Sequence, residues 1–212
     1  MLHYICSALK FRNVILVVLL VLLADQGLKI YVKLNFFAQE HLSVIGNWFQ
    51  LFFIENDGMA FGMKFGTKWG KLILTSFRLI AVIWGFYFVN KELVKKGYAK
   101  GLVFCAALIL AGAMGNLIDS LFYGKIFTET GFHAAKLVPW GQGYGELFHG
   151  KVVDMLYFPL FSFTWPDFLP YVGGTSFEFF RPIFNIADSS IFIGVATILL
   201  FQKRLLGNRK HE

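Results

Sequence analysis

The chain has 212 residues, of which 57% are hydrophobic, 18% aromatic and only 16% charged, and its mean hydropathy is +0.60. This composition excludes an ordinary soluble domain and indicates a membrane protein with several spans. The net charge of +7 would suit nucleic acid, but Lys and Arg in the cytoplasmic loops of a membrane protein explain it better. We therefore expect no nucleic-acid partner.

The first predicted span covers residues 12–32, in which an uninterrupted apolar run, Val14 to Ala24, follows Lys10 and Arg12. It is long enough to span a bilayer and lacks the small-residue cleavage site of a secretory signal peptide, so we predict an uncleaved first helix. Asp25 and Lys29 lie four residues apart with the acid first, which is the favourable order for a pair on a helix. We predict that they form a structural ion pair.

Residues 34–68 change to short aromatic and β-branched pieces broken by glycine and asparagine, as in NDGMAFG at 56–62. This pattern predicts strands and turns, which cannot span a membrane as one helix. Phe and Trp are also typical of the membrane–water interface. We predict a small β platform on the outer face of the membrane.

Two further spans are predicted at residues 71–90 and 101–119, on either side of a basic linker. Within residues 72–89, Arg78 is the single charged residue. The later span ends in GAMGNLID, whose small residues favour close helix packing. Close helix packing explains the small residues of this motif but not its Asn116 and Asp119.

Residues 120–183 are rich in glycine and aromatic residues and contain all five prolines of the chain, so they cannot form one spanning helix. Asp154 lies here in a short apolar patch, and an isolated acid in a loop is ordinarily solvated. The segment also carries four aromatic residues that we expect at lipid headgroups: Tyr157, Phe158, Phe161 and Trp165. We predict a long excursion on the outer, periplasmic side.

The last apolar run, residues 184–202, begins with FNIADS and puts Asn185 and Asp188 on one helix face. Asn116 and Asp119 repeat this spacing. An acid at membrane depth costs about 2.5 to 3.5 kcal/mol on insertion scales, so Asp188 should face a protein interior or a wet cavity.

Clusters of Lys and Arg lie near the start of the chain, in the linker 91–100 and in the tail 203–210. Four spans put all three clusters on one side, which the positive-inside rule makes the cytoplasm. The sequence thus predicts an all-α membrane protein, residues 1–212 in a single domain, with four transmembrane helices, both termini cytoplasmic, and the β platform and the periplasmic excursion outside.

In this topology Asp119, Asp154 and Asp188 lie at the same outer boundary. The sequence offers no GxSxG serine, no Cys–His pairing and no histidines at metal-ligand spacing, so carboxylate chemistry without a metal is the remaining option. Two close carboxylates do not both ionise easily, and such a pair supplies a general acid and a general base. Peptide hydrolysis by an activated water uses this pair, but a proton or ion pathway would use the same acids.

Five motifs in chain order carry a family resemblance: DQ with Lys29, NDGMAFG, GAMGNLID, VVD and FNIADS. With them the sequence resembles the bacterial lipoprotein signal peptidases (signal peptidase II). The resemblance implies that Asp154 and Asp188 are the catalytic pair and that Asp25 and Lys29 are structural. It assigns substrate-binding or supporting roles to Asn56, Gly58, Asn116, Asp119 and Asn185.

The resemblance also implies an aspartic endopeptidase of the bacterial cytoplasmic (inner) membrane that needs no cofactor. Its substrates would be diacylglyceryl-modified prolipoproteins, cut before the lipidated cysteine, and its other partners membrane lipids; we expect a monomer. The alternatives are a small proton-coupled transporter, which should show repeated halves or broken helices, and a non-catalytic membrane scaffold.

Two features depart from the family pattern. Ser120 stands where the family has arginine after the acid of the GAMGNLID motif, so a salt bridge to Asp119 or a substrate contact must come from another residue, with Lys151 and Arg181 as candidates. The segments 120–151 and 155–181 are longer than in compact members, and we expect them to cover the site or to add a partner surface.

Overall fold

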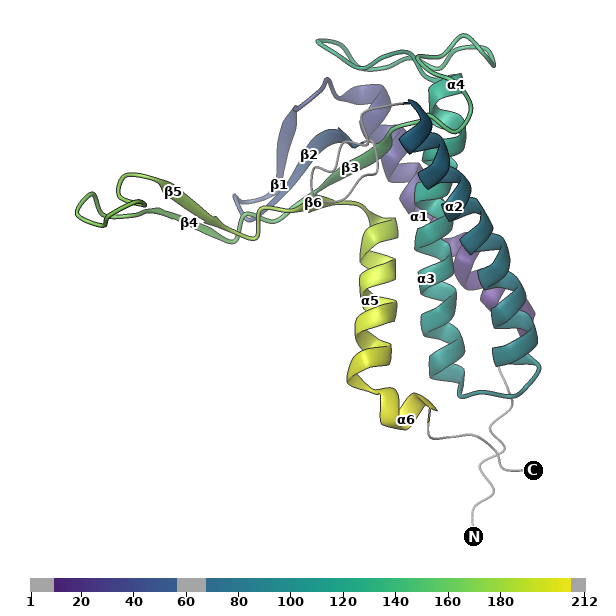
Figure 1. The fold of residues 1–212 in the computed structure, drawn as a ribbon. Coiled ribbons are helices and arrows are strands. Elements are labelled where there is room, and N and C mark those ends of the chain that lie inside the picture. The colour runs from purple at the N-terminus through teal and green to yellow at the C-terminus, as the bar shows by residue number, and fades with distance from the viewer. Residues whose placement is uncertain (1–9, 57–67, 207–212) are drawn as a thin grey trace.

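The structure is a computed structural model and describes residues 10–56 and 68–206. Long helices stand side by side in a bundle, a small sheet lies at one end of it, and a thin two-stranded arm projects sideways from the sheet (Figure 1). We call this end of the bundle the sheet end. The opposite end, where α6 (Gln202–Leu206) lies, is called the α6 end.

Among residues 10–56 and 68–206, three helices are long and apolar enough to cross a membrane. The first is α1 (Phe11–Asn35), the second is α2 (Lys68–Phe88) with a π-helical turn at Val89–Val94, and the third is α3 (Lys100–Ile118) with a π-helical turn at Asp119–Tyr123 and α4 (Gly124–Ile126). The predicted combination of apolar helices with a small antiparallel sheet is confirmed.

The fourth predicted span, residues 184–202, contains α5 (Ile186–Leu200), an apolar helix of 15 residues. A helix needs about 20 residues to cross a hydrocarbon core of about 30 Å. The described residues therefore contain three helices of spanning length, and the fourth transmembrane helix stays a prediction.

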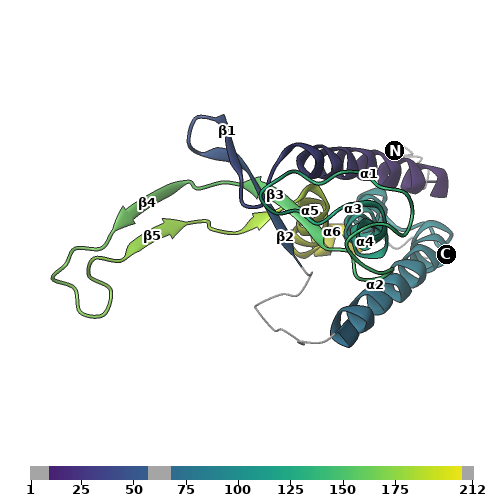
Figure 2. The same cartoon turned by 90° about the horizontal axis from the view of Figure 1, so that it is seen from above.

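Helix α3 occupies the centre of the bundle, with α1, α2 and α5 around it (Figure 2). Its close approach to α5 requires Gly112, because a Cβ atom there would overlap the carbonyl oxygen of Ala187. Gly115 serves the contact with α1, since its Cβ would lie 2.7 Å from the carboxylate of Asp25. Small residues thus bring the polar side chains of α1, α3 and α5 together.

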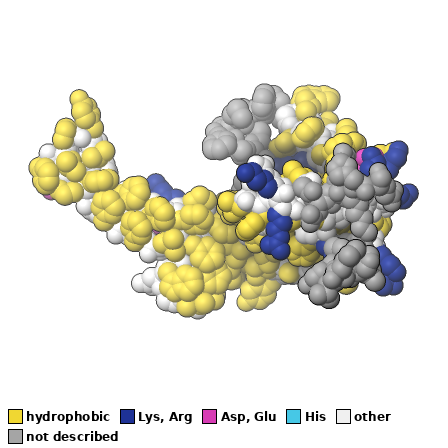
Figure 3. All heavy atoms as spheres, turned by 90° about the horizontal axis from the view of Figure 1, so that it is seen from below, with side chains coloured by type: hydrophobic (Ala, Val, Ile, Leu, Met, Phe, Trp, Pro, Cys, Tyr) yellow, Lys and Arg dark blue, Asp and Glu magenta, His cyan; other side chains and the backbone are white. Residues whose placement is uncertain are grey.

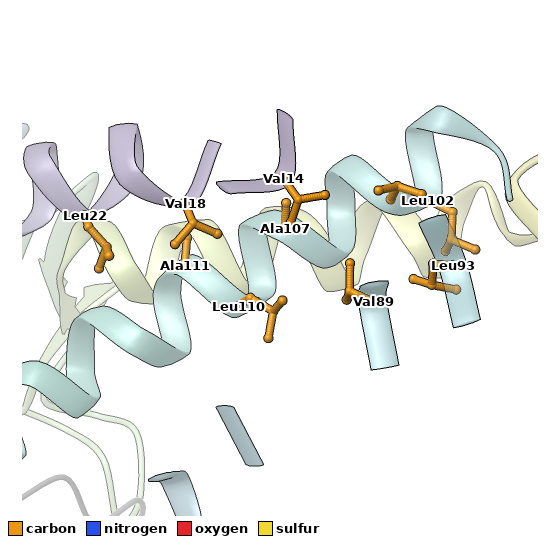
Figure 4. Close-up of a cluster of buried hydrophobic side chains, with 10 residues drawn as sticks. Val14, Val18, Leu22, Val89, Leu93, Leu102, Ala107, Leu110 and Ala111 are labelled. Carbon is orange, nitrogen blue, oxygen red and sulfur yellow. The ribbon is translucent and has the colours of Figure 1, made fainter. Parts of the chain in front are cut away.

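Two apolar clusters hold the molecule together, and the polar side chains lie between them along α1 and α3. Figure 4 shows the cluster inside the bundle, which consists of Val14, Val18, Leu22, Val89, Leu93, Leu102, Val103, Ala107, Leu110 and Ala111. The cluster at the sheet end consists of Val32, Phe36, Leu51, Phe53, Tyr123, Phe127, Ala135, Val153 and Met155.

The main sheet has four antiparallel strands, in the order β1 (His41–Ile45), β2 (Phe49–Asn56), β3 (Val152–Tyr157) and β6 (Ile183–Phe184). The platform predicted at residues 34–68 contains β1 and β2, and the sheet is completed by β3 and β6 from farther along the chain. The expectation of Asp154 in a solvated loop is wrong. β3 pairs with β2 along much of its length and with β6 at Leu156 and Tyr157, and Val152 and Val153 favour extended structure.

The two long segments of the excursion fold differently. Residues 127–151 return over the end of α1, where the amide of Ala38 donates to the carbonyl of Gly131 and that of Ala135 to the carbonyl of Lys33, both at 3.0 Å. Residues 158–182 form the arm, in which β4 (Phe161–Thr164) pairs with β5 (Ser176–Phe179).

Candidate functional site

A buried ion cluster joins α1 to α3. The ammonium group of Lys29 lies 3.0 Å from a carboxylate oxygen of Asp25 and 2.8 Å from one of Asp119, and all three side chains are excluded from solvent. Gln26 donates to both carboxylates, at 3.1 and 2.9 Å. Because its charges are paired and hydrogen-bonded, this cluster can be tolerated in the interior.

The salt-bridge partner of Asp119 is therefore Lys29, and the suggestion of Lys151 or Arg181 for that role is wrong. Lys151 lies against Glu55 and Glu129, and Arg181 lies against Glu178. Lys29 can reach Asp119 because α1 and α3 approach each other closely at Gly115, which places the ammonium group of Lys29 between the two helices.

Arg78 provides a positive charge beside the position where the family has arginine. From α2 its guanidinium donates to the hydroxyl of Ser120 at 3.4 Å, and it lies within electrostatic range of Asp188, Asp119 and Asp154. Sequence analysis noted Arg78 as the charge that interrupts an apolar run but assigned it no role. A charged residue within an apolar run indicates a functional residue, and this signal could have identified Arg78 from the sequence.

Asp154 lies on β3 with only 5% of its surface exposed. One carboxylate oxygen accepts a hydrogen bond from the side-chain amide of Asn185 at 2.7 Å, and the other from that of Asn56 at 3.3 Å. Burial, followed by the nearby charge of Asp188, raises the pKa of Asp154 to about 7. The carboxyl group therefore keeps a proton for part of the time near neutral pH.

Asn185 joins three elements at this point. It is the N-cap of α5, where its side-chain oxygen accepts from the amide of Asp188 at 2.8 Å. Its amide donates to Asp154 and, at 3.1 Å, to the side-chain oxygen of Asn116 on α3. One side chain thus positions β3, α3 and the first turn of α5 relative to one another.

Asn116 connects the ion cluster with Asp188. Its amide donates to a carboxylate oxygen of Asp188 at 2.7 Å, while its oxygen accepts from Lys29 at 2.9 Å. Asp188 is half-buried, so one of the two neighbouring acids remains open to a ligand. Asp154 and Asp188 are linked through the amides of Asn185 and Asn116.

The structure brings eight of the nine residues singled out by sequence analysis into one region at the sheet end of the bundle. They are Asp25, Lys29, Asn56, Asn116, Asp119, Asp154, Asn185 and Asp188. Gly58 lies outside the described residues. Within residues 10–56 and 68–206, no group of three or more His, Cys, Asp or Glu side chains is arranged to hold a metal ion.

Known proteins resemble this chain over most of its length. The family model of signal peptidase (SPase) II matches residues 17–203. A lipoprotein signal peptidase of Porphyromonas gingivalis is 44% identical over 188 residues, covering 88% of this chain and 81% of that protein. One from Amoebophilus asiaticus is 38% identical over 186 residues, covering 87% and 75%.

The fold is also found among solved structures. A bacterial membrane enzyme, determined by the in meso method at 2.3 Å resolution, superposes with a TM-score of 0.62 at 24% identity, covering 99% of this chain and 98% of the other. At that identity the likeness concerns the fold alone.

Proposed function

The chain belongs to the signal peptidase II family, as its motifs predicted, and from this premise we propose that it is an aspartic endopeptidase. Its substrates are diacylglyceryl-modified prolipoproteins, and it cuts them before the lipidated cysteine. The proposal rests on one observation, the linkage of Asp154 and Asp188 through two amide side chains, with a raised pKa for Asp154. The alternative of a proton-coupled transporter finds no support among the relatives.

In the proposed reaction, Asp188 is ionised and Asp154 carries a proton. Asp188 takes a proton from a water molecule, whose oxygen forms a bond with the scissile carbonyl carbon. As the carbon–nitrogen bond breaks, the proton of Asp154 passes to the leaving amine. The pair still holds one proton, now on Asp188, and exchange with solvent restores the starting state.

The surrounding residues have supporting roles in this proposal. Asn185 and Asn116 orient the two acids, and Asn56 holds the second oxygen of Asp154. We keep Gly58 as a substrate-site residue on the strength of its motif.

Arg78 takes the place of the missing family arginine in this proposal. Two observations support this assignment: Arg78 donates a hydrogen bond to Ser120, and it interacts electrostatically with three nearby acids. The positive charge of Arg78 beside these acids stabilises the negative charge that the site carries during the proposed reaction.

The position of the acids suits a lipidated substrate. Asp188 lies in the first turn of an apolar helix and Asp154 on the adjoining sheet, so the site is at the boundary between bundle and sheet. A signal-peptide helix can lie beside the bundle while its scissile bond reaches that boundary. We assign the sheet end to the periplasmic side of the bacterial cytoplasmic membrane, with both termini in the cytoplasm.

A test of this orientation uses Phe132, whose side chain is 96% exposed at the sheet end. A cysteine introduced there, with Cys6 and Cys105 replaced, should react with a membrane-impermeant thiol reagent in intact spheroplasts. Reaction only after permeabilisation would reverse the assignment.

Cleavage of a purified lipidated precursor by the full-length protein in detergent tests the catalytic assignment. Asp154→Asn and Asp188→Asn should each lower the rate by about 10²-fold or more, because an amide keeps the shape of the side chain but cannot transfer the proton. Both variants should still bind a lipopeptide inhibitor. The same precursor without its lipid serves as the substrate control.

The matched control is Asp119→Asn, which should weaken activity less because Asp119 contacts Lys29 and Gln26 in the ion cluster. A rival assignment pairs Asp119 with Asp188. An Asp154→Asn enzyme that still turned over would favour this rival and reject ours.

A further inference from the structure

The register of the arm separates aromatic from polar side chains. Phe161 pairs with Phe179 and Phe163 with Phe177 across β4 and β5. Residues opposite each other in antiparallel strands point to the same face, and successive residues alternate between faces. One face of the arm therefore consists of four phenylalanines, which we call the Phe face. The other, the polar face, carries Ser162, Thr164, Ser176 and Glu178.

The Phe face is ordered but open. The rings of Phe161 and Phe179 stack with centroids 4.9 Å apart, and those of Phe163 and Phe177 lie 5.2 Å apart. Phe161 is nevertheless 53% exposed and Phe179 44% exposed. An isolated two-stranded hairpin is marginal in water, and a contiguous exposed aromatic patch of this kind marks a contact surface.

The Phe face turns toward the same side as the helix bundle. Seen from the α6 end, hydrophobic side chains cover most of the arm, with a few polar atoms between them, and continue toward the bundle (Figure 3). Ring contacts continue the surface at the base of the arm, where Phe158 stacks on Phe49 at 4.8 Å and on Phe184 at 5.8 Å.

The bundle itself has the exposed apolar surface of a membrane-spanning structure. Leu23 on α1 is 71% exposed, Ile73 on α2 67% and Phe192 on α5 73%. Such side chains face acyl chains in a membrane protein. The arm leaves this apolar bundle at the sheet end (Figure 1).

We propose that the arm lies along the membrane surface at the sheet end, with the Phe face in the boundary between headgroups and acyl chains. Aromatic residues are enriched at this depth, and the amphipathic arrangement matches an element that lies in the interface plane. The polar face then meets water. A second copy of the chain could cover the same rings, but it would not explain why the hydrophobic surface of the arm continues toward that of the bundle.

Site-directed spin labelling of the full-length protein in nanodiscs of phosphatidylethanolamine and phosphatidylglycerol tests this placement. In a background with Cys6 and Cys105 replaced, the label is attached at Phe163→Cys on the Phe face or at the adjacent Thr164→Cys on the polar face. The label at 163 should be relaxed strongly by oxygen and weakly by an aqueous nickel chelate, and the label at 164 should show the reverse.

Strong relaxation of both labels by the nickel chelate would overturn the proposal. Dipolar broadening between labels at 163, lost on dilution with unlabelled protein, would instead assign the face to a second copy. Cleavage of the precursor by each labelled protein shows that the protein is folded, and this check is independent of the relaxation measurement. If labelling at 163 disturbs the arm, the neighbouring pair Phe177→Cys and Ser176→Cys on β5 repeats the comparison.

Discussion

Asn185 donates its side-chain amide to Asp154 at 2.7 Å while the oxygen of the same side chain caps the helix that carries Asp188. A single residue therefore makes hydrogen bonds with both members of the proposed catalytic pair. Its two functions can be separated by substitution, because aspartate is a good N-cap but has no amide donor.

Asn185→Asp and Asn185→Ala should both lower the rate of precursor cleavage, by about a hundredfold if Asp154 is displaced by an ångström. The alanine variant should also lose stability, by about 1 kcal/mol, because it removes the cap, whereas aspartate keeps the cap. Cleavage rates and thermal unfolding in the same detergent measure the two effects. An alanine variant as stable as the unmodified protein would show that the cap contributes no stability.

The rate of cleavage should fall as pH rises through about 7. Asp154 must hold its proton to serve the leaving amine, and burial together with Asp188 raises its pKa to about 7, so deprotonation above that value removes the acid. The profile should be bell-shaped, and its two limbs belong to the coupled pair rather than to one residue.

Titration of carboxyl ¹³C signals in aspartate-labelled protein gives an independent check of this pKa. The signal missing from Asp154→Asn should titrate near 7 in the unmodified protein. In Asp188→Asn its midpoint should move to lower pH, because the like charge has gone. An unchanged midpoint would mean that the two acids are not coupled.

Lys29→Met should unfold at a lower temperature than the unmodified protein, since it leaves Asp25 and Asp119 buried without their cation. Removing one partner of a buried pair costs about 3 to 5 kcal/mol. Lys96→Met is the matched control, because the exposed pair of Lys96 with Glu92 contributes only about 0.3 to 0.5 kcal/mol. Similar unfolding temperatures for both variants would contradict the structural role of the cluster.

Arg78→Gln should lower kcat/KM about tenfold or more and move the alkaline limb of the pH profile upward, because a cation near Asp154 opposes its protonation. Lys91→Gln, at the far end of the same span, should change neither. Ser120→Arg in an Arg78→Ala background restores the family arrangement and should recover activity. A pH profile unchanged by Arg78→Gln would reduce Arg78 to a structural residue.

Local spacing predicted several neighbour relations within the candidate site. Asp25 and Lys29 on one helix face, Asn116 with Asp119, and Asn185 with Asp188 are relations between neighbours in the chain, and the period of a helix determines them. The motifs predicted the family for the same reason, since they are short and local. The charge pattern likewise predicted apolar helices separated by basic segments.

Relations between distant segments needed the tertiary structure. Lys29 reaches Asp119 because Gly115 lets two helices approach, and Arg78 reaches Ser120 because α2 packs beside α3. Neither contact has a signature in the spacing of residues.

Strand pairing also depended on contacts between distant segments. Residues 152–157 are too short and apolar to be assigned from their own pattern, and their pairing with β2 and β6 made Asp154 a buried strand residue with a raised pKa. The sequence by itself determined which acids and amides the protein has and which face each shares with its neighbours in the chain. Only the tertiary structure decided which of them meet, because burial and pairing depend on packing between segments far apart in the chain.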